Sequence, residues 1–264
     1  MIDLQSSQDK RNIPIDEVGV CDISHPIIVL DKTSGSQKTV ATLSMTVNLP
    51  HHFKGTHMSR FFEVLNEYQD EMTIRTLSQM LPSLKKRLQA ERAKVEIYFP
   101  YFLEKVAPVS KSPGLMKYEC SFVGNADDQG DDYILGVKVP VTSLCPCSKA
   151  ISKYGAHNQR GHVSIEIRTV RKPNGNPELF WIEDLIEIAE TSASAPVYVL
   201  LKREDEKAVT EQAYENPVFV EDIVRNVAQK LMSDARISWF QVNIVNQESI
   251  HNHNAFARIE WSRT

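Results

Sequence analysis

Cysteine is scarce in this sequence, with four residues among 264. That number is too small for the disulfide framework of a secreted mini-protein, so we expect free thiols. No apolar run approaches the roughly 20 residues that a membrane-spanning helix needs. The N-terminal segment also lacks the apolar core of a signal peptide. The sequence therefore predicts a soluble, cytoplasmic protein without a membrane partner.

An excess of basic charge is also missing, because the formal net charge is −4. A protein without a global positive field is not expected to bind nucleic acid, and a phosphorylated substrate would need a local basic pocket. The sequence contains neither a Gly-rich Walker loop nor a Rossmann fingerprint, which disfavours ordinary ATPase and dehydrogenase chemistry.

The hydrophobic pattern predicts the same order of elements twice. Each half is expected to contain two strands, two helical segments and two further strands. Residues 1–20 are expected to form a polar N-terminal arm, followed by a first module at 21–128 and a second at 129–264. The expected elements are strands at 25–30, 39–49, 94–102, 117–123, 133–141, 162–170, 238–245 and 254–261, and helices around 58–65, 74–88, 181–190 and 218–232.

This order favours an α+β fold with two antiparallel four-stranded sheets, each backed by a helix pair. Open sheets have edges that need covering, so side-by-side joining into a barrel-like oligomer is a plausible arrangement. Pro82 lies inside the second helical stripe and predicts a break or restart of the helix there.

The segment VTSLCPCSKAISKYGAHNQRGHVSI holds the densest group of reactive side chains. Cys145 and Cys147 flank one proline, and His157 and His162 follow before a predicted strand. Two thiols and two imidazoles are typical ligands for zinc or a similar divalent ion, and the spacing differs from that of a zinc finger. An alternative is two buried cysteines and two surface histidines in a polar loop. Nearby Lys149 and Arg160 indicate an exposed site.

A second group lies in QESIHNHNAF, near the C-terminal strand. His251 and His253 point the same way if the segment is extended. Histidines transfer protons near neutral pH, and Glu248 could hold one of them in a chosen tautomer. The alternative is an ordinary hydrophilic hairpin loop.

An acidic stretch, LLKREDEKAVTEQAYENPVFVEDIVR, precedes these histidines. Most of its carboxylates are expected on solvated helix faces. Glu221 begins an apolar-periodic helix and could accept two hydrogen bonds from a guanine base, while Glu206 is a candidate hard metal ligand.

The segment HHFKGTHMSRF lies where the first helix should begin. Backbone amides at a helix start, together with Lys54, His57 and Arg60, make a candidate phosphate contact. An ordinary helix cap is the alternative.

Four of these segments together resemble one known family. KGTHMSRF, SLCPCSK with GAHNQRGH, DEKAVTEQAYENPVFVED and ESIHNHNAFA are similar, in the same order, to the type IB GTP cyclohydrolases of bacteria. The resemblance implies tandem modules of the tunnelling fold and a homotetramer with active sites at subunit interfaces. It also implies conversion of GTP to 7,8-dihydroneopterin triphosphate and formate, the first step of tetrahydrofolate biosynthesis, with Zn²⁺, Mn²⁺ or Fe²⁺.

The resemblance also implies individual roles. Cys145 and His157 look like the metal ligands, and the acidic ligand is assigned to Glu206, with Glu211 as the alternative assignment. Glu221 looks like the glutamate that anchors the purine. The remaining expected catalytic residues are Cys147, Glu248, His251 and His253, and the remaining expected substrate-binding residues are Lys54, His57, Arg60, Lys149 and Arg160.

Two other functions stay open from the sequence. A tunnelling-fold relative could reduce the nitrile of a deazapurine with NADPH and a cysteine nucleophile, although that reaction needs no metal. A non-catalytic module could use the Cys/His site only for structure, in which case removing the metal would unfold it.

Overall fold

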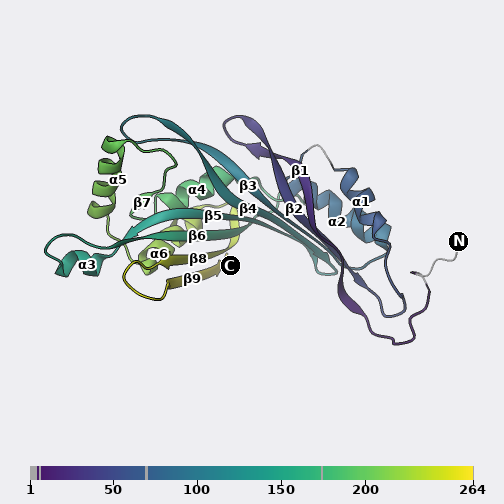
Figure 1. Ribbon diagram of the computed structural model, residues 1–264. Helices are drawn as coiled ribbons and strands as arrows, with labels where there is room; N and C mark the ends of the chain where they lie inside the picture. The colour runs from purple at the N-terminus through teal and green to yellow at the C-terminus, as the bar shows by residue number, and fades with distance from the viewer. Residues whose placement is uncertain (1–4, 6, 69–70, 174, 264) are drawn as a thin grey trace. The chain divides into compact units, whose positions relative to one another are not determined.

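The computed structural model describes residues 5, 7–68, 71–173 and 175–263. Its strands form one sheet in the order β1-β2-β3-β4-β5-β6-β8-β9, with β7 paired to β5 (Figure 1). Neighbouring strands run antiparallel at β1–β2, β2–β3, β5–β7, β6–β8 and β8–β9. The strands are β1 (Ile15–Asp31), β2 (Gly35–Leu49), β3 (Ala93–Val106), β4 (Pro113–Asp127), β5 (Gly130–Leu144), β6 (Asn158–Thr169), β7 (Ala195–Pro196), β8 (Ile237–Gln247) and β9 (Ala255–Ser262). The helices are α1 (Ser59–Asn66), α2 (Ile74–Leu88), α3 (Pro146–Ile151), α4 (Ile182–Glu190), α5 (Arg203–Glu215) and α6 (Val220–Ser233).

The predicted α+β class and the repeated element order are confirmed. The expected division into two four-stranded sheets is wrong, because β4 and β5 are hydrogen-bonded neighbours and join all the strands into one sheet. Each predicted strand and helix is found, and the expected order lacked only α3, β7 and α5. β1 begins at Ile15, so residues 15–20 of the predicted polar arm are strand. Among the described residues, no helix is long and apolar enough to cross a bilayer.

The chain divides into two compact units. Unit 1 comprises Met1–Pro100, Ser121–Leu135 and Arg171–Glu178, and unit 2 comprises Tyr101–Cys120, Gly136–Val170 and Leu179–Thr264. Strands β3, β4 and β5 each supply residues to both units. The predicted module boundary after residue 128 lies in the turn between β4 and β5, and it stays a prediction.

Alternating burial along β2 creates the core of unit 1. Ala41, Leu43 and Met45 are buried, while Thr42 between them is exposed. Helices α1 and α2 lie together beside these strands (Figure 1). Asn48 is also buried, and its Oδ1 accepts hydrogen bonds from the Glu91 and Arg92 amides at 3.0 and 2.7 Å.

The predicted break at Pro82 is wrong, because α2 continues from Ile74 to Leu88. Proline removes one backbone hydrogen bond from a helix. Leu77, Leu81 and Leu84 are fully buried on one face of α2, so apolar burial on both sides of Pro82 compensates for the lost bond.

Unit 2 has its own core, in which α6 packs on β8 and β9 and contacts α4. Ile223, Val227 and Leu231 form an apolar stripe on α6 and are all buried. They face the apolar side of β8, where Val242 and Ile244 are also buried. This packing fixes the strand ends that carry the predicted histidines.

Asp205 is a buried carboxylate that joins α5 to the β3–β4 turn. Its oxygens accept hydrogen bonds from the Ser110 hydroxyl at 2.6 Å and from the Val109, Ser110 and Lys202 amides at 2.8–2.9 Å. Burial alone would raise the pKa of Asp205, but the hydrogen bonds from Ser110, Lys202 and Val109 outweigh it and hold the pKa below its ordinary value. The ionised form of Asp205 therefore stabilises the fold.

A close approach between β6 and β8 requires glycine at position 161. Gly161 lies opposite Asn246 in the register, and a Cβ on it would come within 2.5 Å of Asn246 Oδ1 and 3.1 Å of Val141 Cγ2. Asn246 cannot easily move, because it is buried and its Nδ2 donates to Ser143 Oγ at 2.9 Å. No hydrogen-bond partner of Asn246 Oδ1 is found in the described part of the chain.

Replacing Asp205 tests its ionised form. We expect Asp205→Asn to lower the thermal unfolding midpoint at pH 7, whereas Glu204→Gln, at an exposed position in the same helical turn, leaves it unchanged. A carboxyl group whose pKa is lower in the folded than in the unfolded state stabilises the fold at pH values above its unfolded-state pKa. This stabilisation is lost as the pH falls towards the folded-state pKa. The difference between wild type and Asp205→Asn should therefore shrink below about pH 4. A constant difference from pH 7 to pH 3, measured by differential scanning fluorimetry, would contradict this account.

Replacing Gly161 tests the close approach. Gly161→Ala should lower the free energy of unfolding by about 1–3 kcal/mol, because the added methyl group overpacks a buried site. Gly55→Ala is the control, since a Cβ there has its nearest neighbour at 3.6 Å. The double variant Gly161→Ala/Asn246→Ala should recover part of the lost free energy of unfolding. The measurement is urea unfolding followed by circular dichroism. Equal stability of the two single variants would show that the contact carries no strain.

Candidate active site

Cys145 and His157 are held together by their backbones at one end of the unit 2 sheet. Cys145 directly follows β5 and caps α3, and its amide donates to the His157 carbonyl at 3.1 Å. Ser148 lies between them, because its amide donates to Cys145 Sγ at 3.4 Å and its hydroxyl accepts from the His157 amide at 3.3 Å. The backbones of the two predicted ligand residues are therefore brought together, and both residues are partly exposed.

The predicted proton-transfer histidines lie beside this pair. The His157 and His251 rings are 6.5 Å apart between centroids and meet edge to face. The His251 and His253 rings stack at 5.1 Å with an interplanar angle of 18°. The segment that carries them is bent rather than extended, so the stacking arises from the loop and not from the expected strand geometry. Both histidines reach the same end of unit 2 as the Cys/His pair.

Gln159 connects the two groups and was missed from the sequence. His157 Nδ1 lies 3.0 Å from Gln159 Oε1, and Gln159 Nε2 donates to Glu248 Oε1 at 3.4 Å. The signal was present in the sequence, because residues i and i+2 of a strand face the same side. Gln159 is 9% exposed, so its amide is almost entirely enclosed by these partners.

Two of the predicted residues near this site have other contacts. Lys149 Nζ donates to the Tyr214 carbonyl and lies 4.3 Å from the Tyr214 ring centroid, which ties α3 to the end of α5. His162 is further along β6, where burial lowers its pKa and the Lys138 and Arg160 cations lower it further. Cys147 and Arg160 are exposed, on α3 and β6 respectively.

The predicted carboxylates lie on two helices of unit 2. Glu206 and Glu211 are exposed on α5, and Glu211 pairs with Lys207 at 3.8 Å. Glu221 is exposed in the first turn of α6. No three His, Cys, Asp or Glu side chains of the described chain converge to hold a metal ion. The assignment of Glu206 or Glu211 as the acidic ligand therefore stays a prediction.

The donor set of the pair fits a divalent transition metal. A thiolate and a neutral imidazole are typical zinc ligands, and two protein donors leave positions for other ligands and water. His157 uses Nδ1 for Gln159, so Nε2 is the nitrogen that remains for an ion.

The predicted phosphate contacts lie in unit 1 around the start of α1. The Lys54 amide donates to Ser7, and Arg60 NH1 donates to the Arg87 carbonyl at 3.0 Å. His57 accepts from the Arg60 amide through its carbonyl at 3.1 Å. These contacts organise the segment, and its role in phosphate binding stays a prediction.

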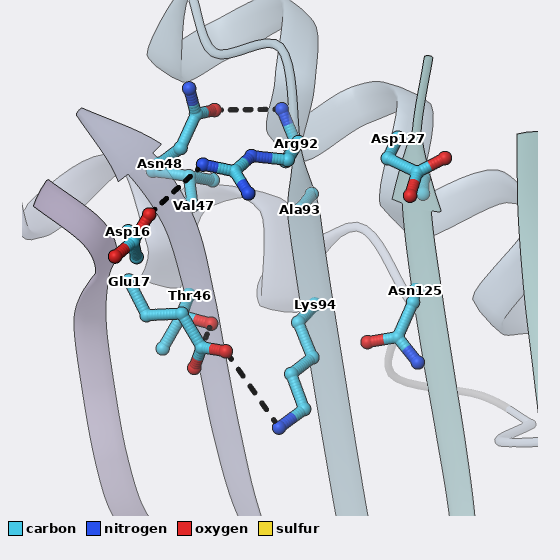
Figure 2. A pocket seen from close by; sticks show the side chains of 11 residues that line it. Asp16, Glu17, Thr46, Val47, Asn48, Arg92, Ala93, Lys94, Asn125 and Asp127 are labelled. Atoms are coloured by element: carbon cyan, nitrogen blue, oxygen red, sulfur yellow. Dashed lines mark hydrogen bonds and ion pairs between the residues drawn. The ribbon is translucent and has the colours of Figure 1, made fainter. Parts of the chain in front are cut away.

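Unit 1 also contains a polar pocket of about 280 Å³ at the ends of its strands (Figure 2). Its two cations are paired with carboxylates, Arg92 with Asp16 at 3.3 Å and Lys94 with Glu17 at 4.0 Å. An anionic phosphate chain needs uncompensated cations, so the pocket does not fit such a ligand.

Proteins with known structures share this architecture at very low sequence identity. A uricase from Arthrobacter globiformis matches with a TM-score of 0.54 and 7% identity, covering 94% of this chain and 93% of that one. A urate oxidase from Bacillus subtilis 168 also gives 0.54, with 7% identity over 94% of this chain and 98% of that one. At this identity the likeness shows the fold alone, which is the predicted tunnelling fold.

Proteins of similar sequence identify the family. Residues 1–257 match the family described as type I GTP cyclohydrolase folE2. The GTP cyclohydrolase FolE2 of Syntrophotalea carbinolica is 56% identical over 261 residues, covering 99% of this chain and 95% of that protein. Its counterpart in Syntrophobacter fumaroxidans is 52% identical over 264 residues, covering 100% of both. The chain therefore belongs to the type I GTP cyclohydrolase FolE2 family.

Proposed function

We propose that this protein is a GTP cyclohydrolase that opens the imidazole ring of GTP at C8. The products would be 7,8-dihydroneopterin triphosphate and formate, which begins tetrahydrofolate biosynthesis. The observation that carries the proposal is the convergence of Cys145 and His157 with His251 and His253 at one end of unit 2. Full-length similarity to proteins named GTP cyclohydrolase FolE2 supports it.

Cys145 and His157 would hold a divalent ion, which we propose to be Zn²⁺, Mn²⁺ or Fe²⁺. When bound, such an ion supplies an activated water for attack at C8. Glu206 is the proposed acidic ligand, and Glu211 is the alternative assignment. The exposed thiol of Cys147, two residues from Cys145, would tune or guard the metal thiolate.

His251 and His253 would carry the protons of the reaction. Ring opening needs a proton on the departing ring nitrogen, and later rearrangement needs protons moved to and from carbon and oxygen. Stacked imidazoles 5.1 Å apart can serve neighbouring atoms of one substrate. Glu248 is linked through Gln159 to His157 and would hold the local hydrogen bonds in one orientation.

Substrate recognition would combine a carboxylate for the base with cations for the phosphates. Glu221 presents two acceptor oxygens, which suit the N1–H and 2-amino group of guanine. Lys54, His57, Arg60, Lys149 and Arg160 are the proposed contacts for the triphosphate.

We also propose a homotetramer with active sites at subunit interfaces, in the cytoplasm. Two observations support the assembly. The described part of one chain does not complete a three-ligand metal group. The terminal strands β1 and β9 of the sheet also each have an edge that pairs with no other strand in the sheet order. The metal-type donor pair and the relatives' names do not favour a nitrile reductase or a purely structural metal module.

Turnover and metal content test the role of Cys145. Purified protein incubated with GTP and Zn²⁺, Mn²⁺ or Fe²⁺ should give a product that oxidises to fluorescent neopterin. Cys145→Ala should remove both turnover and stoichiometric metal, because it deletes a ligand. Cys21→Ala, which changes an exposed cysteine of β1, is the matched control and should retain both. Neopterin formation by Cys145→Ala at the wild-type rate would refute the assignment, and absence of product with every metal would refute the function.

Substrate discrimination tests the role of Glu221. Glu221→Gln replaces one acceptor oxygen with a donor, so KM for GTP should rise about 10- to 100-fold through loss of a charged hydrogen bond. Wild type should prefer GTP over inosine triphosphate, which lacks the 2-amino group, and Glu221→Gln should reduce that preference. Glu215→Gln, at the exposed end of α5, is the control. If Glu221→Gln keeps the wild-type preference for GTP over inosine triphosphate, the guanine base is not bound by Glu221.

A further inference from the structure

Gln159 is the enclosed polar side chain between the two reactive groups of unit 2. It lies at the start of β6 and follows His157, which precedes the strand, by two residues. Its Oε1 lies 3.0 Å from His157 Nδ1, and only 9% of Gln159 is exposed. A buried amide is costly unless both of its ends are hydrogen-bonded. Both ends of this amide are used, and both are used by residues of the site.

Glu248 determines which way the Gln159 amide points. An ionised carboxylate only accepts hydrogen bonds, so the NH₂ end of the amide must face Glu248. Gln159 Nε2 donates to Glu248 Oε1 at 3.4 Å in this orientation. The carbonyl end of the amide must then face His157.

The orientation of the amide in turn selects the tautomer of His157. The Gln159 carbonyl oxygen can only accept, so His157 Nδ1 must carry the hydrogen and donate it. A neutral imidazole protonated at Nδ1 has its lone pair on Nε2, and a metal ion binds a lone pair. Glu248 therefore sets the orientation of the Gln159 amide, and that amide sets the tautomer of His157.

We propose that Gln159 is a positioning residue for the metal site. It fixes the tautomer and ring orientation of His157, and it joins that ligand to Glu248, near the segment that carries His251 and His253. The inference rests on the proposed function, in which His157 binds a divalent ion. Partners of this kind hold metal-binding histidines in many proteins, and their loss weakens metal binding.

The backbone of β6 does not depend on this side chain. Arg160 pairs with Gln247 and Gly161 with Asn246 in the β6–β8 register, and the Cys145 amide bonds to the His157 carbonyl. These bonds remain when the Gln159 amide is replaced. A change in metal affinity can therefore be separated from a change in fold.

Metal affinity measures the proposed role without reference to turnover. Gln159→Met keeps the length and volume of the side chain but removes its amide. The dissociation constants for Zn²⁺ and Co²⁺ are measured in the full chain by competition with a chromophoric chelator, and we expect both to rise about 10- to 100-fold. The visible spectrum of the Co²⁺-loaded protein should also change, because His157 loses its fixed orientation.

A matched control makes the same chemical change elsewhere in unit 2. Gln241 is a hydrogen-bonded glutamine on β8, where its Oε1 accepts from Arg258 NH2 at 2.5 Å. It pairs with Glu166 in the register, away from the end of the sheet that carries His157. Gln241→Met should leave both dissociation constants and the Co²⁺ spectrum unchanged.

A double variant tests the direction of the hydrogen bonds. In Gln159→Glu/Glu248→Gln, the new carboxylate accepts from His157 Nδ1–H, and the new amide donates to that carboxylate. The variant preserves the tautomer with exchanged side chains, so it should regain most of the metal affinity lost in Gln159→Met.

The measurements separate the positioning role of Gln159, the tautomer of His157 and the metal-dependent function. Wild-type affinity in Gln159→Met, or equal losses in Gln159→Met and Gln241→Met, would overturn the positioning role while leaving the proposed function intact. A double variant as weak as Gln159→Met would overturn the tautomer argument. A wild-type protein that binds none of Zn²⁺, Co²⁺, Mn²⁺ and Fe²⁺ would instead overturn the metal-dependent function itself.

Discussion

One backbone hydrogen bond, from the Cys145 amide to the His157 carbonyl, holds the rest of the site in place. It closes the loop that contains α3 at a distance of 3.1 Å. Ser148 completes the closure by donating to Cys145 Sγ and accepting from the His157 amide. The backbones of Cys145 and His157 are therefore positioned by hydrogen bonds at a strand end, and a scaffold of this kind preorganises side chains for a metal or a substrate. The Gln159 amide then sets the orientation of the ring within that frame.

The sequence predicted the framework well because burial in this protein follows simple periods. The alternation along β2 and the stripe of Ile223, Val227 and Leu231 on α6 were visible in the letters alone. The same reasoning failed where tertiary contacts overrode local preference. Pro82 did not end α2, because the helix buries apolar side chains both before and after Pro82. Helix α5 was not among the expected elements, because it has only two buried residues, Asp205 and Ala213, and therefore little apolar periodicity.

The candidate site was predictable to a similar extent, and for related reasons. Cys145 and His157 are chemically distinctive and close in sequence, so their meeting could be anticipated. The carboxylates of α5 could not be separated by pattern. Asp205 is fully buried and bonded to Ser110, whereas Glu206 beside it is exposed. Adjacent acidic residues look equivalent in a sequence, and only the packing of α5 against the β3–β4 turn distinguishes a structural carboxylate from one that remains available to a ligand.

Charge imposes the last constraint on how a triphosphate could be held. The chain carries a net charge of −4, so only local cations can balance the phosphates. Lys149 is already engaged, since its ammonium group donates to the Tyr214 carbonyl and lies over the Tyr214 ring. Binding a phosphate there would release α3 from the end of α5 and would loosen the helix that Cys145 caps. Arg160 is exposed on β6 and its guanidinium can bind a phosphate through two hydrogen bonds without that cost. Of the two proposed phosphate contacts in unit 2, Arg160 can therefore bind a phosphate at the lower cost, whereas Lys149 must first leave Tyr214.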